Sequence, residues 1–452
     1  MFSNKRRTSG FFYRITARPR VALCISVVAI AIASTGLAKL VKDTSVKAFI
    51  PPDHPVLLAD QKAADVFGLS DTIAIALTTT GTTVFEAGVL ETIVELTEKV
   101  SSLPNIRSDR VLSLATESSI SGEDGRILVT PYIGELPLTP GDIEAARGQW
   151  RAMPPHIGTL VSEDESSAIV LAEIIDSRLA DATYRTILEA VTGLETDALE
   201  IRVAGPGAVS GYLSRYIDKD ARKLQPLVFL LVLGFIYFAF RRIGALPGPL
   251  LVVFGAVGGA LGLMAWNGVS YYAITNALPV IIVAISVADS IHILSAYFQY
   301  RSRHPDLPTR DLVVRAMTTM ARPISLTTIT TIAGFVGIGF VSIMPPITAF
   351  AWYAARGVFL AWLFSILALP NMLVLLELGP SPAFENWTRN TPSGLGQFLA
   401  RTGAFSARHY PFVLGSFAAA TIIAMTGASQ LTVDRSQVDN FAPDEPIRIA
   451  DE

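Results

Sequence analysis

Residues 243–288 contain no charged side chain, and this stretch constrains the fold of the chain more than any other feature. A helix needs about 20 apolar residues to cross a hydrocarbon core about 30 Å thick, so the stretch is too long for one membrane span. Asn267-Gly268, near its middle, is typical of a turn. The stretch therefore predicts two membrane helices joined by a short connection.

Five further apolar stretches predict membrane helices on either side of this pair. In order, they are Val21–Ala38, Leu224–Phe240, Pro323–Met344, Ala349–Leu376 and Pro411–Ala428. The composition agrees, because 51% of the residues are hydrophobic and only 17% are charged. The sequence predicts a polytopic α-helical membrane protein with seven spans.

Basic residues lie on one side of these spans. Six precede the first span, Arg241-Arg242 follows the second, and five arginines lie between residues 301 and 322. The short turns on the opposite side carry no charge. Because cytoplasmic loops are rich in Lys and Arg, the N-terminus is predicted to lie in the cytoplasm.

The predicted spans divide the chain into seven segments. They are a basic N-terminus (1–20), a first span (21–40), an extracytoplasmic domain (41–222), a five-helix unit (223–376), a cytoplasmic linker (377–410), a seventh span (411–430) and the start of a second extracytoplasmic domain (431–452).

The first extracytoplasmic domain has an α+β pattern. Apolar and amphipathic periodicities predict, in order, a strand at 73–80, a helix at 84–103, strands at 106–114 and 167–175, a helix at 178–193 and a strand at 199–204. A Pro-rich excursion covers residues 131–160. This βαβ-βαβ order is typical of a split ferredoxin-like domain.

A related motif follows both the first and the seventh span. The first copy is Phe49-Ile50-Pro51-Pro52-Asp53-His54-Pro55, and the second is Phe441-Ala442-Pro443-Asp444-Glu445-Pro446. Parallel repeats of this kind are a transporter architecture. We therefore expect the chain to be part of a longer protein with a repeat of about 390 residues, the spacing of the two motifs. We also expect residues 1–452 alone not to transport.

Asp289 is a carboxyl residue inside the predicted fourth span. It lies 12 residues before Arg301, which is about 18 Å along a helix and close to the bilayer midplane. A charge at that depth costs about 2.5–3.5 kcal/mol on insertion scales, so Asp289 is expected to face the bundle interior. It either relays protons or is a neutral packing residue held by hydrogen bonds.

Two polar residues share a helical face with Asp289. Ser286 lies three residues before it and His292 three residues after it. Burial favours the neutral form of both a carboxyl group and an imidazole, so His292 is a second candidate for a proton relay. Ser286 is a candidate hydrogen-bond partner of the carboxyl group.

The fifth span begins with a series of hydroxyl-bearing residues. Among them, Thr327, Thr328 and Thr331 are candidate hydrogen-bond partners of Asp289, because hydroxyl groups can bond a neighbouring carboxyl group. Gly334, Gly337 and Gly339 follow and would permit close approach of another helix. Ordinary helix packing is the alternative interpretation for the whole segment.

Arg356 is the other charged residue inside a predicted span, and Trp352 and Tyr353 stand close to it. Its long side chain could extend to the membrane interface, which is the first interpretation. The second is contact with a substrate or a lipid headgroup, which makes Arg356 a candidate substrate-binding residue.

Other features predict packing or exclude classes of site. The overlapping GxxxG pairs Gly255/Gly259 and Gly258/Gly262 predict close helix packing. Gly205-Pro206-Gly207 lacks the context of a nucleotide fingerprint, and a net charge of −3 gives no reason to expect a nucleic-acid partner. Because Cys24 is the one cysteine and the histidines have no metal-ligand spacing, no metal site is expected.

Three of these motifs resemble those of the resistance–nodulation–division (RND) superfamily. The run Val287–His292 resembles the fourth-helix motif of its hydrophobe/amphiphile exporters and mycobacterial-membrane-protein-large (MMPL) transporters. Arg322–Phe335 resembles their fifth-helix signature, and Phe49–Asp53 resembles the entry to their first periplasmic domain. Predicted spans two to six also resemble the sterol-sensing unit of Patched-like proteins. Ser290 departs from the usual tyrosine and Ser286 from the usual glycine.

The resemblance implies a secondary transporter rather than an enzyme. It would export hydrophobic or amphiphilic, lipid-like substrates from a bacterial inner membrane, with Asp289 as the proton-relay carboxylate and the proton gradient in place of a cofactor. Membrane lipids, a second copy of the chain and a periplasmic adaptor are the expected partners. Two alternatives stay open, a lipid- or sterol-sensing protein that does not pump and a protein-export accessory.

Overall fold

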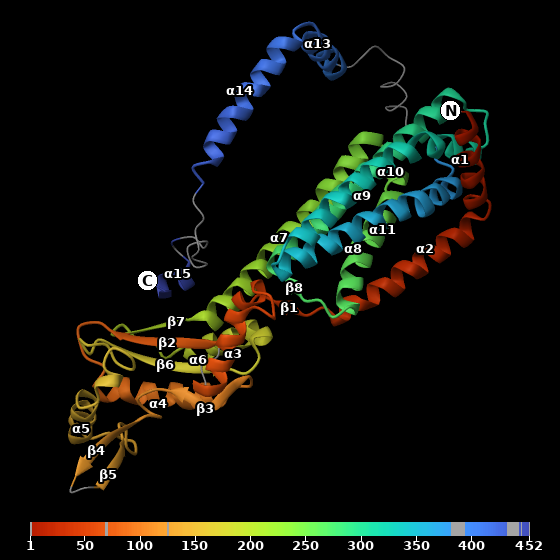
Figure 1. Cartoon of the computed structure of the whole chain (residues 1–452). Helices are drawn as coiled ribbons and strands as arrows, with labels where there is room; N and C mark the ends of the chain where they lie inside the picture. Colours follow the sequence, from red (N-terminus) through yellow and green to blue (C-terminus); the bar gives the residue numbers. More distant parts are fainter. Residues whose placement is uncertain are drawn as a thin grey trace.

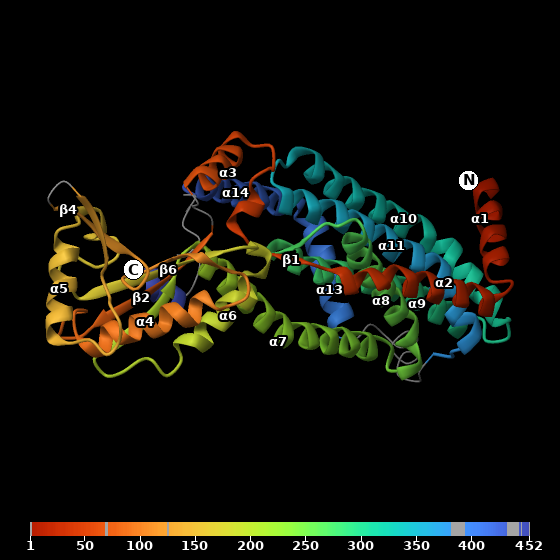
Figure 2. The same cartoon turned by 90° about the horizontal axis from the view of Figure 1, so that it is seen from below.

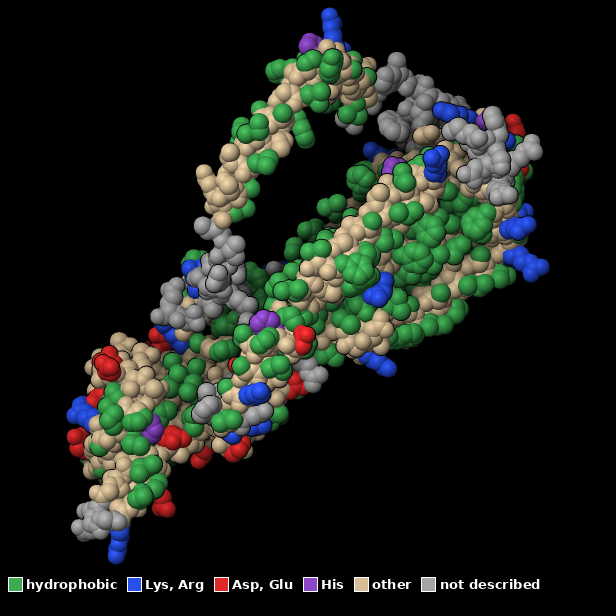
Figure 3. Space-filling view, in the orientation of Figure 1, with side chains coloured by type: hydrophobic (Ala, Val, Ile, Leu, Met, Phe, Trp, Pro, Cys, Tyr) green, Lys and Arg blue, Asp and Glu red, His purple; other side chains and the backbone are tan. Residues whose placement is uncertain are grey.

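The computed structural model describes residues 2–67, 71–123, 126–380, 394–431, 443 and 445–451. It consists of a helical bundle and a domain built on a β-sheet at one end of that bundle (Figure 1). Charged side chains gather on the sheet domain, whereas the visible surface of the bundle is mostly hydrophobic (Figure 3). This distribution is that of a multi-pass membrane protein with a water-exposed domain.

Seven helical segments among the described residues are long and apolar enough to cross a membrane, at the seven predicted positions. They are α2 (Pro19–Ser34) with its continuation η1 (Thr35–Lys39), α7 (Pro206–Phe240), α8 (Pro247–Trp266), α9 (Leu278–Arg303), α10 (Thr309–Val341), α11 (Pro345–Leu376) and α14 (Tyr410–Ala428). Of these, α8, α9 and α11 are the most buried. α14 has no buried residue and stands apart from the bundle (Figure 1).

Two membrane helices are longer than the apolar stretches that predicted them. α7 begins 18 residues before Leu224, in the sheet domain, and α10 begins at Thr309, so Pro323 lies inside it. A proline within a helix removes one backbone hydrogen bond, but packing on both sides can preserve the helix. α10 has such packing, because Leu312, Val313 and Ile324 are all buried.

Close helix packing explains the glycines of α8. A Cβ atom on Gly262 would lie 1.8 Å from the carbonyl oxygen of Ala33, and one on Gly36 would lie 2.1 Å from the carbonyl oxygen of Gly262. A Cβ atom on Gly258 would lie 2.6 Å from the hydroxyl oxygen of Ser34. The predicted GxxxG packing face therefore contacts the first span.

The sheet domain has four antiparallel strands in the order β3-β6-β2-β7. Their bounds are β2 (Thr72–Thr79), β3 (Ile106–Leu112), β6 (Ser167–Ile174) and β7 (Leu199–Ala204). α4 (Ala87–Ser101) and α6 (Ala180–Val191) fill the two crossovers. Strands and helices alternate as the sequence predicted. Alternate residues of β2, namely Ile73, Ile75 and Leu77, are fully buried against these helices.

The segment between β3 and β6 contains structure that the sequence did not predict. β4 (Ser118–Glu123) and β5 (Arg126–Pro131) form an exposed hairpin, and α5 (Pro140–Arg151) lies inside the Pro-rich excursion. The hydroxyl of Thr139 and the carboxylate of Asp142 form a capping box at the start of α5. This cap allows a helix to begin at Pro140.

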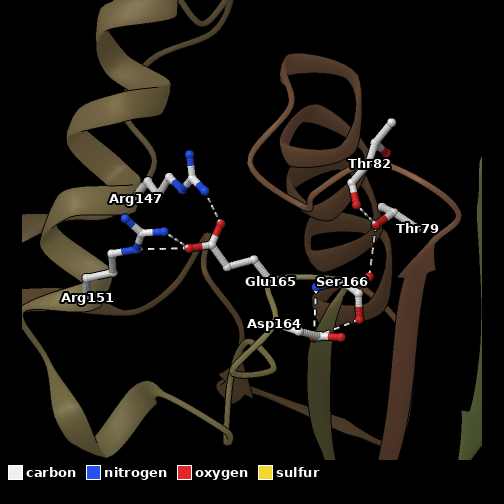
Figure 4. Close-up of polar contacts among 7 residues, drawn as sticks. All are labelled: Thr79, Thr82, Arg147, Arg151, Asp164, Glu165 and Ser166. Carbon is white, nitrogen blue, oxygen red and sulfur yellow. Dashed lines mark hydrogen bonds and ion pairs between the residues drawn. The ribbon is translucent and has the colours of Figure 1, made fainter.

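A buried carboxylate fastens α5 to the rest of the domain (Figure 4). Glu165 is 5% exposed, and its Oε2 atom lies 2.6 Å from Nη2 of Arg147. Nε of Arg151 donates to Oε1 of Glu165 at 2.9 Å. Burial by itself would raise the pKa of Glu165, but the two arginines outweigh burial and the pKa is lowered. Glu165 is therefore held as a carboxylate.

The junction between β7 and α7 explains the Gly205-Pro206-Gly207 motif. Gly205 has a φ of +94°, and a Cβ atom there would lie 2.9 Å from the carbonyl oxygen of Thr72. A Cβ atom on Gly207 would lie 2.5 Å from Cδ1 of Ile174. The motif serves a tight strand-to-helix turn against the sheet.

The end of the chain returns to the sheet domain. α15 (Pro446–Asp451) packs against β7 and α7, and Ile447 is 1% exposed within the core of the domain. The phenol of Tyr212 donates to the carboxylate of Glu445. Phe441, Ala442 and Asp444 of the repeated motif lie outside the described residues, as does part of the predicted linker, residues 381–393.

Candidate functional site

Asp289 lies in the interior of the bundle, on α9. It is 6% exposed, and its Oδ2 atom has no hydrogen-bond partner among the described residues. The nearby hydroxyl of Ser290 donates to the carbonyl oxygen of Ser286 at 2.8 Å and is therefore engaged with its own helix. A buried polar atom without a partner is costly, and in native structures it often marks a functional group.

A cavity of about 260 Å³ opens beside Asp289, between α9 and α10. Its lining consists of Ile285, Ala288, Asp289, His292, Met320, Pro323, Ile324, Thr327, Thr328 and Thr331. One water molecule takes about 30 Å³ in the liquid, so the cavity has room for several. The sequence-predicted residues Asp289, His292, Thr327, Thr328 and Thr331 thus meet at one cavity.

The three threonines contact this cavity, but they are not hydrogen-bonded to Asp289 among the described residues. Thr328 donates to the carbonyl oxygen of Ile324 at 2.8 Å, and Thr331 donates to that of Thr327 at 2.8 Å. Thr327 itself donates to Ile324 at 2.8 Å. A hydroxyl oxygen whose hydrogen is already donated can still accept, so each threonine remains able to accept a hydrogen bond from water or from a neutral carboxyl group.

His292 and Ser286 differ in their surroundings. His292 is exposed at the surface of the bundle and contacts the cavity one helical turn from Asp289. Ser286 is fully buried, its hydroxyl has no partner among the described residues, and it does not line the cavity. The structure therefore brings His292, but not Ser286, to the cavity of Asp289.

The glycines of α10 play a smaller packing role than the sequence suggested. Cβ atoms on Gly334 and Gly337 would meet no described atom within 4 Å. Only Gly339 has a close neighbour, the indole of Trp352 at 3.1 Å. Within the described chain, α10 thus presents an open face beyond the threonines.

Two buried polar residues of α11 were not singled out from the sequence. Ser365 and Asn371 are both fully buried, and the Ser365 hydroxyl and the Asn371 Oδ1 atom have no hydrogen-bond partner in the described chain. Their signal was a polar residue inside an apolar helix, which is weaker than a charge because serine and asparagine are tolerated in membrane helices.

Arg356 lies at a different cavity, of about 680 Å³, near the sheet domain. Its guanidinium carbon lies 4.6 Å from the centre of the Tyr353 ring, a cation–π contact. The structure thus separates the candidate substrate-binding residue from the candidate proton relay. Among the described residues, no cluster of His, Cys, Asp and Glu could hold a metal ion.

Comparison with known families gives one match. Residues 230–375, which hold both Asp289 and Arg356, match the model of the Patched family, described as the Patched sterol-sensing domain. The chain carries a Patched-like membrane unit. This unit is related to those of the RND and MMPL transporters, so the resemblance seen in the sequence is confirmed for this part of the chain. No curated protein matches the chain.

The Patched-like unit covers α8 to α10 completely, together with most of α11 and the last third of α7. It suggests a transporter rather than an enzyme and a membrane protein related to lipids or sterols. The cavity between α9 and α10 lies wholly inside it.

Proposed function

We propose that the protein is a proton-driven exporter of hydrophobic or amphiphilic, lipid-like substrates and that Asp289 relays the protons. The observation that carries this proposal is a carboxyl group that is almost fully buried among membrane helices, has a free oxygen and borders a cavity. A packing residue would be expected to have both oxygens hydrogen-bonded.

The proposed relay uses a change of charge inside the bundle. A buried carboxylate without a positive partner is unfavourable, so proton uptake from the cavity stabilises Asp289 in its neutral form. Proton release restores the charge and the tendency to attract water or positive groups. Two helix arrangements that differ in their preference for these charge states would then alternate as protons pass.

His292 and the threonines supply the remaining parts of the path in this proposal. His292 is exposed and lies on the side of Asp289 farther from the sheet domain, where it can exchange protons with water. Thr327, Thr328 and Thr331 can order water molecules between the imidazole and the carboxyl group. Thr327 is exposed, Thr331 is half-buried and Thr328 is buried, so the three hydroxyls line the cavity at different depths.

The proposal includes the predicted arrangement in the membrane. The chain would lie in a bacterial inner membrane with its N-terminus in the cytoplasm, and the sheet domain would be an extracytoplasmic, split ferredoxin-like porter domain. The strand order β3-β6-β2-β7, with helices in both crossovers, supports that fold. A second, similar repeat would follow α14, as the repeated motif suggests.

A lipid or sterol sensor that does not pump is the second candidate. The match to a domain described as sterol-sensing favours it. A sensor needs no titrating group at Asp289, so the two candidates differ in what they require of that residue.

Efflux from cells distinguishes these candidates. Cells that make the full-length protein, its Asp289→Asn variant or its Ser365→Ala control would be loaded with Nile red, a hydrophobic dye. Efflux of the dye would be followed with and without a protonophore. We expect protonophore-sensitive efflux by the protein and by Ser365→Ala, which alters a buried polar residue away from the cavity. Asp289→Asn should abolish it at equal membrane abundance. Normal efflux by Asp289→Asn would favour the sensor.

A further inference from the structure

A second cavity, of about 680 Å³, lies where the bundle meets the sheet domain. Three connections border this open cavity, because its lining includes Pro51 after the first span, Tyr272 between α8 and α9, and Ser342 between α10 and α11. The two-residue strands β1 (Lys42–Asp43) and β8 (Tyr271–Tyr272) pair in parallel and fix the first two connections to each other. The cavity is therefore a defined part of the fold.

Arg356 supplies the only charged side chain among the residues that line this cavity. It lies eleven residues after Pro345, or about 16 Å along α11, and its side chain leans toward the start of that helix. In the described chain it forms no ion pair with a carboxylate, although a membrane-embedded charge is usually paired. Among the described residues, the guanidinium thus has no counter-charge.

The tyrosine beneath Arg356 is held in place. Tyr353 is 4% exposed, and Nδ2 of Asn267 donates to its phenol oxygen at 2.8 Å. The cation–π contact of 4.6 Å occupies one face of the guanidinium and leaves the N–H groups at its edge free to donate. Such an edge matches the oxygens of a phosphate or a carboxylate.

Apolar side chains continue from the cavity along the surface of α10. Ile343 lines the cavity and is 78% exposed, and Phe340 and Val341 beside it are 76% and 84% exposed. An acyl chain can lie against such a surface while its headgroup enters the cavity. A cationic, aromatic-edged cavity at the head of an apolar strip fits an amphiphile better than a soluble anion.

We propose that this cavity binds a membrane lipid with an anionic headgroup, whose phosphate or carboxylate oxygens accept hydrogen bonds from Arg356. A sterol carries only a neutral hydroxyl and would leave the guanidinium without a counter-charge, so it fits this cavity less well. The proposal goes beyond proton-driven export, because binding here does not involve Asp289.

Fluorescence quenching by brominated lipids tests this proposal, because Trp352 lines the cavity. The protein would be reconstituted with increasing fractions of acyl-brominated phosphatidylglycerol, acyl-brominated phosphatidylcholine or brominated cholesterol. The difference between the protein and its Trp352→Phe variant isolates the signal of Trp352 from those of the other tryptophans. We expect phosphatidylglycerol to quench Trp352 at about a tenfold lower fraction than phosphatidylcholine, which corresponds to about 1.4 kcal/mol.

Variants assign the preference to the guanidinium. In Arg356→Gln, both phospholipids should quench Trp352 equally. Arg356→Lys should keep part of the preference for phosphatidylglycerol because it keeps the positive charge. Asp289→Asn should keep all of it, so failure of the export proposal and failure of the lipid site give different results. Unchanged thermal unfolding of Arg356→Gln would verify that its bundle is intact.

Three results would overturn the assignment. The first is equal quenching of Trp352 by both phospholipids in the unaltered protein, which needs no variant to fold. The second is stronger quenching by brominated cholesterol than by phosphatidylglycerol, which would make the cavity a sterol site. The third is loss of the phosphatidylglycerol preference on addition of inorganic phosphate at constant ionic strength, which would indicate a site for a soluble anion.

Discussion

Removing the carboxylate of Glu165 should release α5 from the sheet domain. Glu165 is 5% exposed and contacts both Arg147 and Arg151, the last residue of the helix. A hydrogen bond to a charged group contributes about 1.5–3 kcal/mol. Because the arginine side chains are 31% and 56% exposed, solvent screens both contacts. We therefore expect Glu165→Ala to weaken the attachment of α5 by about 2 kcal/mol in total.

Hydrogen exchange of the α5 amides measures this effect directly. A loss of about 2 kcal/mol should lower their protection roughly 30-fold, while the amides of β2 and β6 stay protected. Glu165 has a φ of +62°, so Glu165→Gly is the matched control, which removes the same carboxylate but relieves the backbone. Both variants should free α5, and Glu165→Gly should be the more stable of the two. Unchanged protection of α5 in both variants would refute the tether.

The same attachment should depend on pH. The pKa of Glu165 is lowered in the folded domain, so its stabilising contribution is complete above the unfolded value of about 4.3 and is lost as the pH falls through the lower folded value. Protection of α5 should therefore be constant between pH 7 and about pH 5 and should fall only under more acidic conditions. A loss of α5 protection between pH 7 and pH 5 would contradict this pH dependence.

Two further predictions concern packing and topology. Gly262→Val should separate α8 from the first span and lower the yield of folded protein in detergent. Gly234→Val, in open space on α7, is the control and should leave the yield unchanged. Equal yields of the two variants would contradict the close contact at Gly262. Topology can be tested with single cysteines in a Cys24→Ser background. Ile127→Cys, in the exposed hairpin, should react with an impermeant maleimide in intact spheroplasts. His304→Cys, just after the end of α9, should react only after lysis. The reverse labelling pattern would refute the proposed orientation.

Hydropathy was sufficient to predict the membrane helices, because a bilayer requires long apolar segments whatever their packing. It could not predict that α7 and α10 continue through polar residues outside the apolar stretches. There the helices are stabilised by contacts with distant parts of the chain, such as the packing of α7 on β2 and of α10 on α1 (Phe2–Ile15). Figure 2 shows α7 extending from the bundle into the sheet domain.

In the sheet domain, too, the sequence predicted some elements and not others. β2 and the first part of β6 alternate between buried and partly exposed residues, and that period was visible in the sequence. β5 is exposed at every residue, so no burial pattern marked it. The start of α5 did have a signal, the Thr139-Pro140 pair followed by Asp142, which is a capping box.

At the candidate site, the sequence identified the residues but not their hydrogen bonds. The helical spacing of Asp289 and His292 predicted that they share a face, and both line the same cavity. The threonines were candidate hydrogen-bond partners of Asp289, with ordinary helix packing as the alternative, and their hydroxyls donate to carbonyl oxygens of their own helix. Sequence cannot decide between these partners, because the choice depends on the distance between α9 and α10.

Proton movement into proteoliposomes tests most directly whether Asp289 relays the protons that drive export. The full-length protein would be reconstituted with pyranine inside the vesicles, and Nile red would be added under an imposed pH gradient. We expect a dye-dependent change of internal pH for the unaltered protein and for Ser365→Ala. For Asp289→Asn we expect a rate at least about 100-fold lower, because a proton-transfer group is lost. Dye-dependent proton movement by Asp289→Asn at the rate of the unaltered protein would contradict this role of Asp289.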